Sequence, residues 1–173
     1  MAILHTPRLI LRRWHEQDLS PFAAMCADAE VMRWIRNGET RSRDECARII
    51  ASLESAWDEQ GFGLFALERR DNGEFLGFAG LSIPDYLPEV LPAVEIGWRL
   101  PRQAWGQGYA TEAAQAALQF ANDQADIHRL VSICQIGNTA SERIMQKIGL
   151  TLERETIDPT CGRPVRVYAQ ITP

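Results

Sequence analysis

The chain has 173 residues, of which 46% are hydrophobic and 24% charged, and its formal net charge is −5. This composition is typical of folded globular proteins and excludes disorder and low-complexity function, and the length favours a single domain spanning residues 1–173. The acidic balance argues against nucleic acid as a partner, because binding to phosphates requires a basic surface.

The first half of the chain has the pattern of a strand, three helices and a hairpin. Alternating apolar and polar residues predict strands, and apolar residues three or four apart predict helices. Asp71-Asn72-Gly73 is a strong hairpin turn sequence and joins the last two strands. The expected elements are a strand at 8–14, helices at 18–27, at 30–35 and between Ser42 and Gly61, and strands at 62–68 and 75–83.

The longest of these helices has both a start signal and a clear packing face. Ser42 and Glu45 form a predicted capping box, and Gly61 ends the helix. Its apolar residues fall on one side, which should pack on a sheet. They are Cys46, Ile49, Ile50, Leu53 and Trp57.

The second half alternates strands and helices after a proline-rich loop at 84–92. Strand–helix–strand units place parallel strands in one sheet, whereas the short hairpin makes the first half antiparallel. A mixed α/β sheet is therefore expected. Its remaining elements are a strand at 93–100, a helix after Gly108, a strand at 130–136, a helix at 139–148 and strands at 152–157 and 165–171.

Metal sites, secretion and membrane insertion are not expected. The four cysteines and three histidines are scattered and include no Cys-x-x-Cys pair. The N-terminal segment MAILHTPRLILRRW is interrupted by arginines and lacks the apolar stretch of a signal peptide. No segment approaches the roughly 18 apolar residues of a membrane span. We therefore expect a cytoplasmic protein without a membrane partner.

A glycine turn stands between a strand and an alanine-rich helix. Gly106 and Gly108 allow backbone N–H groups to approach a ligand, and the positive end of the helix favours a pyrophosphate. A Walker loop needs Gly-Lys-Ser/Thr, which is missing, and a dinucleotide fingerprint needs a third glycine where Thr111 stands. The sequence thus predicts a different phosphate-binding turn, with an ordinary strand-to-helix turn as the plainer interpretation.

Three segments together resemble the Gcn5-related N-acetyltransferases, the GNAT superfamily, and within it the RimJ/RimL-type branch. WGQGYATEA resembles the cofactor motif, TPRLILRRW the opening of that branch, and NTASERIMQKIGL a third family block. The motif begins either at Gln103 or, in the register we prefer, at Trp105, where the family usually has Gln or Arg. The resemblance covers nearly the whole chain. It implies a GNAT fold, a mixed sheet of six to seven strands flanked by about four helices and splayed between strands four and five.

The resemblance also implies acetyl-CoA as the co-substrate, no metal, and direct transfer to a primary amine. The strand ending in Trp98, Arg99 and Leu100 would pair with the pantetheine arm, which Asn138 would also bind. A backbone N–H near Trp98 would polarise the thioester carbonyl. The residues expected to form the pyrophosphate turn are Trp105, Gly106, Gln107, Gly108, Tyr109, Ala110 and Thr111.

A lysine-like amine is protonated at neutral pH, so the reaction needs a base. Glu95 is the first candidate and Glu68 the second. Met145 stands where many family members have a tyrosine that acts as the general acid. Ser141, one helical turn earlier, is expected to protonate the leaving thiolate of CoA or to donate a hydrogen bond to it. In the plainer interpretation Glu95 is a non-catalytic cleft carboxylate, and Asn138 and Ser141 only cap a helix.

The acceptor pocket is expected to lie between residues 34–41, 84–92 and 158–164. The acceptor is either a protein N-terminal α-amine, as the RimJ/RimL resemblance suggests, or a small-molecule amine. Met145 also motivates an alternative function, that of a catalytically inactive CoA-binding sensor or interaction module. Both a monomer and a homodimer remain open.

Overall fold

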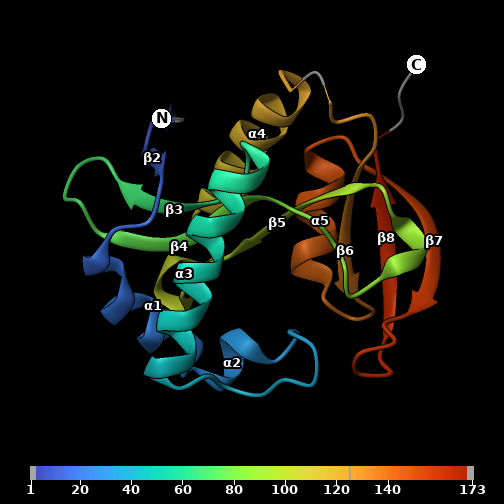
Figure 1. Cartoon of the computed structure of the whole chain (residues 1–173), viewed down its shortest axis with the longest axis horizontal. Helices are drawn as coiled ribbons and strands as arrows, with labels where there is room; N and C mark the ends of the chain where they lie inside the picture. The colour runs from blue at the N-terminus through green and yellow to red at the C-terminus, as the bar shows by residue number, and fades with distance from the viewer. Residues whose placement is uncertain (1–2, 125, 171–173) are drawn as a thin grey trace.

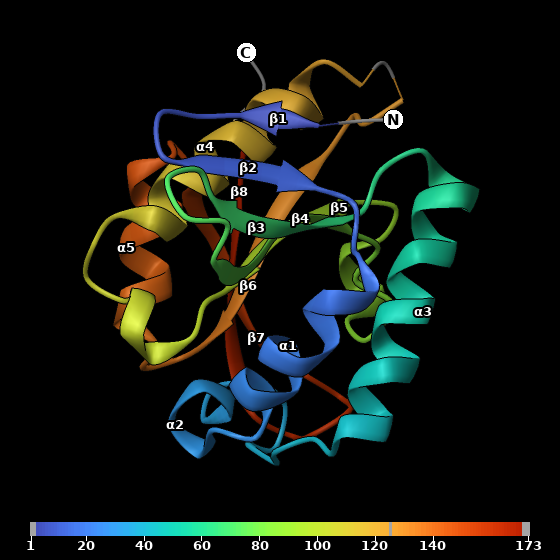
Figure 2. The ribbon, with the colours of Figure 1, turned by 90° about the vertical axis from the view of Figure 1, so that its left-hand side faces the viewer.

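The computed structural model describes residues 3–124 and 126–170. Its strands are β1 (Leu4–His5), β2 (Leu9–Arg12), β3 (Leu64–Arg69), β4 (Phe75–Ser82), β5 (Val94–Arg99), β6 (Leu130–Gln135), β7 (Thr151–Ile157) and β8 (Pro164–Ala169). They form one eight-stranded sheet in the order β1-β2-β3-β4-β5-β6-β8-β7 (Figure 1, with β1 labelled in Figure 2). The β5–β6 pair is parallel and the other pairs in the described residues are antiparallel.

The predicted mixed α/β sheet is confirmed, with one strand more than expected. The additional strand, β1, has only two residues, too few to show an alternating pattern. The hairpin between β3 and β4 turns at Asp71-Asn72-Gly73, as predicted, and Gly73 has the positive φ of 74° that this turn requires. The predicted end of the last strand, Ile171, lies outside the described residues.

Helices cover both faces of the sheet (Figure 2). The helices are α1 (Leu19–Cys26), α2 (Ala29–Met32), α3 (Arg43–Gln60), α4 (Tyr109–Asn122) and α5 (Thr139–Lys147). The first three pack on one face of β3 and β4, whereas α4 packs on the opposite face over β2, β4 and β5, and α5 packs against β6. In the described part of the chain, no helix combines the length and apolarity needed to cross a membrane.

Local signals in the sequence explain the bounds of α3. The Ser42 hydroxyl accepts a hydrogen bond from the Glu45 N–H at 3.3 Å, and the Glu45 carboxylate accepts one from the Ser42 N–H at 2.7 Å. Gly61 ends the helix with a φ of 75°. The capping box and the glycine stop are therefore both confirmed.

The helix predicted at 30–35 is shorter than expected, because α2 ends at Met32. The carbonyls that follow are bound by side chains from distant segments. Arg163 donates to the carbonyls of Arg33 and Asn37, and the Gln135 amide donates to the carbonyl of Arg36. These tertiary partners replace helical hydrogen bonds, and no local sequence pattern announces them.

The sheet opens between β5 and β6, which are the fourth and fifth of the strands expected from the sequence. The parallel pairing of these two strands covers only Val94–Leu130 and Glu95–Val131. Beyond that point the Ser132 hydroxyl donates to the Ile96 carbonyl at 2.8 Å and replaces a backbone hydrogen bond. The predicted splay is therefore confirmed, and it leaves strand edges without neighbours in the middle of the sheet.

Candidate active site

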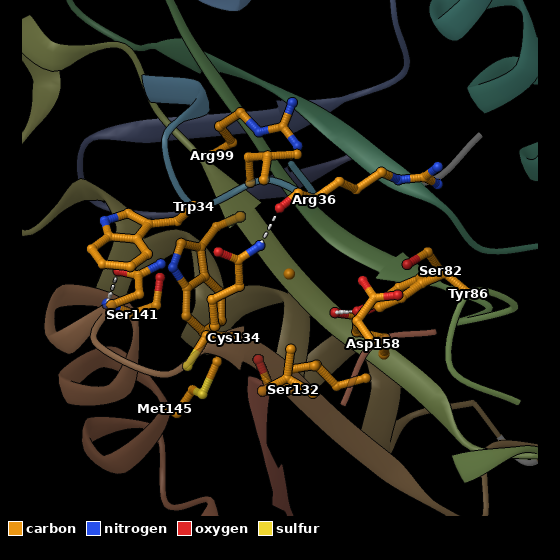
Figure 3. A pocket seen from close by; sticks show the side chains of 18 of the residues that line it. Trp34, Arg36, Ser82, Tyr86, Arg99, Ser132, Cys134, Ser141, Met145 and Asp158 are labelled. Atoms are coloured by element: carbon orange, nitrogen blue, oxygen red, sulfur yellow. Dashed lines mark hydrogen bonds between the residues drawn. The ribbon is translucent and has the colours of Figure 1, made fainter. Parts of the chain in front are cut away.

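A cavity of about 360 Å³ lies where β5 and β6 separate (Figure 3). Its walls come from both strands, from α5 and from the three loops that the sequence analysis assigned to the acceptor pocket. Trp34 and Arg36 come from the first loop, Tyr86 from the proline-rich loop and Asp158 from the third. The expected convergence of these loops on one pocket is thus observed.

Glu95 lies at the point where the strands part. Its carboxylate accepts a hydrogen bond from the Tyr86 hydroxyl at 2.9 Å. Burial raises the pKa of Glu95 to about 7, and the charge of Asp158 also raises it, whereas hydrogen bonds from Tyr86 and from the Ile133 N–H lower it. A carboxyl group with this pKa is poised to accept a proton near neutral pH.

Glu68, the second candidate base, is engaged elsewhere. Its carboxylate binds the Arg12 guanidinium at 2.7 Å, and it is not among the residues that line the cavity. Arg12 also binds Asp18, so Glu68 belongs to a buried ion-pair network beside β2. The geometry therefore favours Glu95 over Glu68 as the base.

The main-chain groups of β5 alternate between its two neighbouring strands. The Val94 N–H binds the Arg129 carbonyl and the Ile96 carbonyl binds Ser132, so both residues direct their main chain toward β6. Residues two apart in a strand point the same way, so the N–H and C=O of Trp98 also face the splay. Trp98 therefore offers a free strand edge at the place where the resemblance requires one.

Arg99 and Leu100 differ from Trp98 in this respect. The Arg99 carbonyl lies against Gly77 of β4, where an added Cβ would clash with it, so the main chain of Arg99 faces β4 and not the splay. The Leu100 carbonyl accepts the indole N–H of Trp105 at 2.8 Å. Of these two predicted pantetheine contacts, neither presents a free carbonyl to the splay.

The predicted residues of the third family block meet at the other side of the cavity. Asn138 caps α5, because its Oδ1 accepts a hydrogen bond from the Ser141 N–H at 3.3 Å. The helix-capping role expected in the plainer interpretation is therefore observed for this oxygen. Ser141 lines the cavity beside Met145, which is 1% exposed. Ser141 and Glu95 thus line the same cavity.

Several cavity residues have no counterpart among the predicted site residues. Tyr86 and Asp158 lie in two of the loops expected to form the pocket, but no motif singles out either of them or Cys134, so only the three-dimensional structure identifies these side chains. Trp34 rests on the turn before α5, where a Cβ on Gly137 would lie 3.1 Å from the indole ring. The signal in the sequence that could have suggested Tyr86 is its place in the proline-rich loop at 84–92, which was expected to line the pocket.

The glycine turn lies at the N-terminus of α4 and exposes its main chain. Gly106 and Gly108 have φ values of 72° and 81°, and Gly108 is the N-cap of α4 without any side-chain cap. The backbone N–H groups of residues 106–111 have no hydrogen-bond acceptor within residues 3–124 and 126–170. Such a run of free N–H groups at a helix N-terminus is suited to a pyrophosphate.

The turn is held from outside by the N-terminal segment. The Arg8 guanidinium donates to the Gln107 carbonyl at 2.8 Å and lies 4.4 Å over the Tyr109 ring. Glu112 in α4 accepts hydrogen bonds from the Thr6 hydroxyl at 2.6 Å and from the Arg8 side chain at 2.7 Å. Two of the sequence blocks that carry the family resemblance therefore contact each other directly.

Trp105, at the start of the motif, is 49% exposed, and its indole N–H donates to the Leu100 carbonyl. Its side chain therefore shapes the turn from outside. The tyrosine that follows Gly108 is buried, because Tyr109 packs with Leu9 and Leu11 of β2 in the core below α4.

Comparison with known proteins agrees with this geometry. The family model described as "Acetyltransferase (GNAT) domain" matches residues 8–151. The YkkB protein of Bacillus subtilis (strain 168) is 35% identical over 95% of this chain and 93% of its own length.

Solved structures share the fold. A GNAT-family acetyltransferase from Bacillus anthracis superposes with a TM-score of 0.80 at 23% identity, covering 98% of each chain. RimL, described as a ribosomal L7/L12 alpha-N-protein acetyltransferase in complex with coenzyme A, superposes with a TM-score of 0.79 at 19% identity, again over 98% of each chain. At these identities the likeness supports the fold and not the substrate.

Proposed function

The chain belongs to the GNAT family of acetyltransferases, and we propose that it transfers the acetyl group of acetyl-CoA directly to a primary amine. The observation that carries this proposal is the position of Glu95. A carboxyl group with a pKa of about 7 lies in the splay beside the free main-chain edge of Trp98. A candidate general base and a candidate oxyanion donor thus lie on one strand and line one cavity, and acyl transfer to an amine uses both kinds of group.

The residues present fit acetyl-CoA. The free N–H groups of residues 106–111 would bind its pyrophosphate, and the edge of Trp98, with the amide of Asn138, would bind its pantetheine arm. The complex of RimL with coenzyme A supports the same cofactor here. Bound acetyl-CoA supplies an acetyl group activated as a thioester.

Groups of the protein would then accept and donate protons and stabilise the developing charge. Glu95 would accept a proton from the acceptor amine, directly or through water, as the nitrogen bonds to the acetyl carbon. The Trp98 N–H would stabilise the negative charge that develops on the carbonyl oxygen. As the carbon–sulfur bond breaks, the Ser141 hydroxyl would donate a proton or a hydrogen bond to the departing thiolate.

Two classes of acceptor fit this chemistry. RimL is a ribosomal L7/L12 alpha-N-protein acetyltransferase, which supports a protein α-amine as the acceptor here. The cavity of about 360 Å³ lies within the range of small-ligand pockets, and loops close it on several sides, which supports a small molecule.

The proposal is tested by mixing purified protein with acetyl-CoA and a broad panel of amines, including peptides, and following the release of free thiol. We expect release that depends on one class of amine and acetylation of that amine by mass. Silence across the panel would count against the proposal.

Met145 favours one competing function, a CoA-binding module without catalysis. It is buried where many family members carry the tyrosine that acts as the acid. Tight binding of acetyl-CoA in calorimetry, together with no thiol release from any amine, would support that function. Turnover of any amine would exclude it.

A further inference from the structure

The cavity has a positively charged wall that the transfer reaction does not use. Arg99 lies on β5, four residues beyond Glu95, and its side chain also lines the cavity (Figure 3). Alternate residues of a strand lie on the same face, so Glu95, Gly97 and Arg99 share one face of β5. That face therefore has a carboxylate at one end and a guanidinium at the other.

Arg99 is half-buried and lacks the carboxylate partner that a buried cation normally has. Its guanidinium donates to the Met32 sulfur at 3.7 Å, lies 5.1 Å from the centroid of the Phe78 ring and has the thiols of Cys26 and Cys46 close by. Its Nε is buried and has no hydrogen-bond partner in the described residues, and no carboxylate in that part of the chain lies within 4.0 Å of its guanidinium. An uncompensated buried charge is unfavourable, and burial accordingly lowers the pKa of Arg99.

Arg12, which is buried, provides a comparison. Arg12 is bound by Asp18 at 2.8 Å and by Glu68 at 2.7 Å. The fold thus surrounds the buried guanidinium of Arg12 with two carboxylates and places none against the half-buried guanidinium of Arg99, whose Nε is buried without a partner in the described residues. A carboxylate from a ligand in the cavity would supply the counter-charge that this part of the chain does not.

Gly97 leaves room for such a group. A Cβ at Gly97 would have no neighbouring heavy atom within 4 Å, so the face of β5 between Glu95 and Arg99 is open. A strand rises about 3.3 Å per residue, so each charged residue lies roughly 7 Å along the strand from Gly97. A small molecule lying over Gly97 would therefore have a carboxylate on one side and a guanidinium on the other.

We propose that the acceptor is an amino acid, a small molecule with a carboxylate a few bonds from its amine, and that Arg99 binds that carboxylate. This inference rests on the proposed function and narrows its acceptor. Glu95 and the nearby Asp158 attract an ammonium group and repel a carboxylate, whereas Arg99 does the reverse. The charges thus orient the acceptor with its amine toward the base, and guanidinium–carboxylate pairing supplies specificity.

The test compares matched acceptors. Free α-, β- and γ-amino acids and their carboxamides are offered with acetyl-CoA, and thiol release is measured for the wild type and for Arg99→Gln. We expect kcat/KM to be at least about tenfold higher for the best acid than for its amide. Arg99→Gln should lower kcat/KM for the acid about tenfold or more and change the amide less than about threefold.

Arg48→Gln is the matched control, because Arg48 lies exposed on α3, away from the cavity. It should change neither acceptor. Arg99→Lys, which keeps the charge, should retain a preference for the acid. Melting curves should show no loss of stability in Arg99→Gln, and calorimetry should show unchanged binding of CoA.

Several outcomes would overturn the assignment of Arg99. These are a preference for amides, an equal loss for acid and amide in Arg99→Gln, or acetylation of peptides alone. If CoA binds but no amine is turned over, the proposed function fails separately. Binding of the amino acid carboxylate by Arg99 is then tested by the melting temperature of the CoA complex. Amino acids should raise this temperature in the wild type and not in Arg99→Gln. Equal shifts in both proteins, or no shift in either, would refute the role of Arg99.

Discussion

Glu95 combines a raised pKa with a position in the splay, and a single substitution tests both. Because the base acts when deprotonated, and its pKa is about 7, activity should be present above pH 7 and be lost as the pH falls through 7. Glu95→Gln should lower kcat/KM about 10²- to 10⁴-fold and remove this acidic limb. The measurement is a pH–rate profile with calorimetry of CoA binding, which should be unchanged. An intact limb in the variant would assign the titration to another group.

Tyr86 gives a finer test of the same site. Its hydroxyl stabilises the charged form of Glu95 and so lowers the pKa of that carboxyl group. Tyr86→Phe removes the donor, and the pKa of Glu95 should rise further. The acidic limb of the pH–rate profile should then move to higher pH, with activity at high pH largely kept. A shift to lower pH, or loss of activity at every pH, would show that Tyr86 acts in some other way.

At the scale of single residues, the sequence was most informative where a motif fixed the position. Glu95, Asn138 and Ser141 were named from a strand and a family block, and all three line the cavity. The loops that carry Tyr86 and Asp158 were expected to line the pocket, but the two side chains were not named, because their positions depend on how the loops pack in the folded chain. Contacts of that kind leave no periodic pattern in the sequence.

At the scale of elements, the turn before α4 offers a matched pair of substitutions. Gly106→Ala and Gly108→Ala both place a side chain at positive φ, which costs about 1–2 kcal/mol of strain. At Gly108 the new Cβ would also lie 3.3 Å from the Arg8 guanidinium, whereas at Gly106 it meets open space. Calorimetry should therefore show weaker CoA binding for both variants, with the larger loss, about tenfold or more, for Gly108→Ala. Unchanged affinity in both would refute the assignment of the turn.

The contact between the N-terminal segment and α4 makes a second prediction at this scale. Glu112 binds both Thr6 and Arg8, and Arg8 in turn holds the Gln107 carbonyl. Glu112→Gln keeps the shape of the side chain and weakens the pairing with Arg8, so the turn should become looser. We expect a higher Kd for CoA, by about threefold to tenfold, and an unchanged pH–rate profile at saturating CoA. A changed profile would mean that Glu112 influences the base.

Most elements were predictable because their signals are local. The capping box of α3, the Asn-Gly turn and the alternation of β5 each depend on a few neighbouring residues. The exceptions are β1, which has too few residues to show a pattern, and the end of α2, after which the carbonyls of Arg33, Arg36 and Asn37 are bound by Arg163 and Gln135 from distant segments. At the end of α2, tertiary hydrogen bonds outweigh local propensity.

At the scale of the whole molecule, the splayed sheet brings the two halves of the chain to one site. Strands β1 to β5 lie on one side of the splay and supply Glu95 and Trp98, and β6, β8 and β7 lie on the other side with α5, which supplies Ser141 and begins at its N-cap Asn138. A ligand in the splay would contact both halves, and binding to the folded state stabilises it. Saturating CoA, at about 100 times its Kd, should raise the free energy of unfolding by about 2.7 kcal/mol, measured by denaturant titration. No change on adding CoA would contradict a site that spans the splay.

The central claim is that a main-chain turn and a strand edge hold acetyl-CoA while Glu95 prepares the amine for direct attack. The most direct measurement is a single-turnover reaction with isotopically labelled acetyl-CoA, quenched at intervals and analysed by mass spectrometry. The account predicts that label passes to the acceptor amine in step with CoA release, while the mass of the protein stays unchanged. A labelled protein that forms and decays during the reaction, or no transfer of label to any amine, would contradict it.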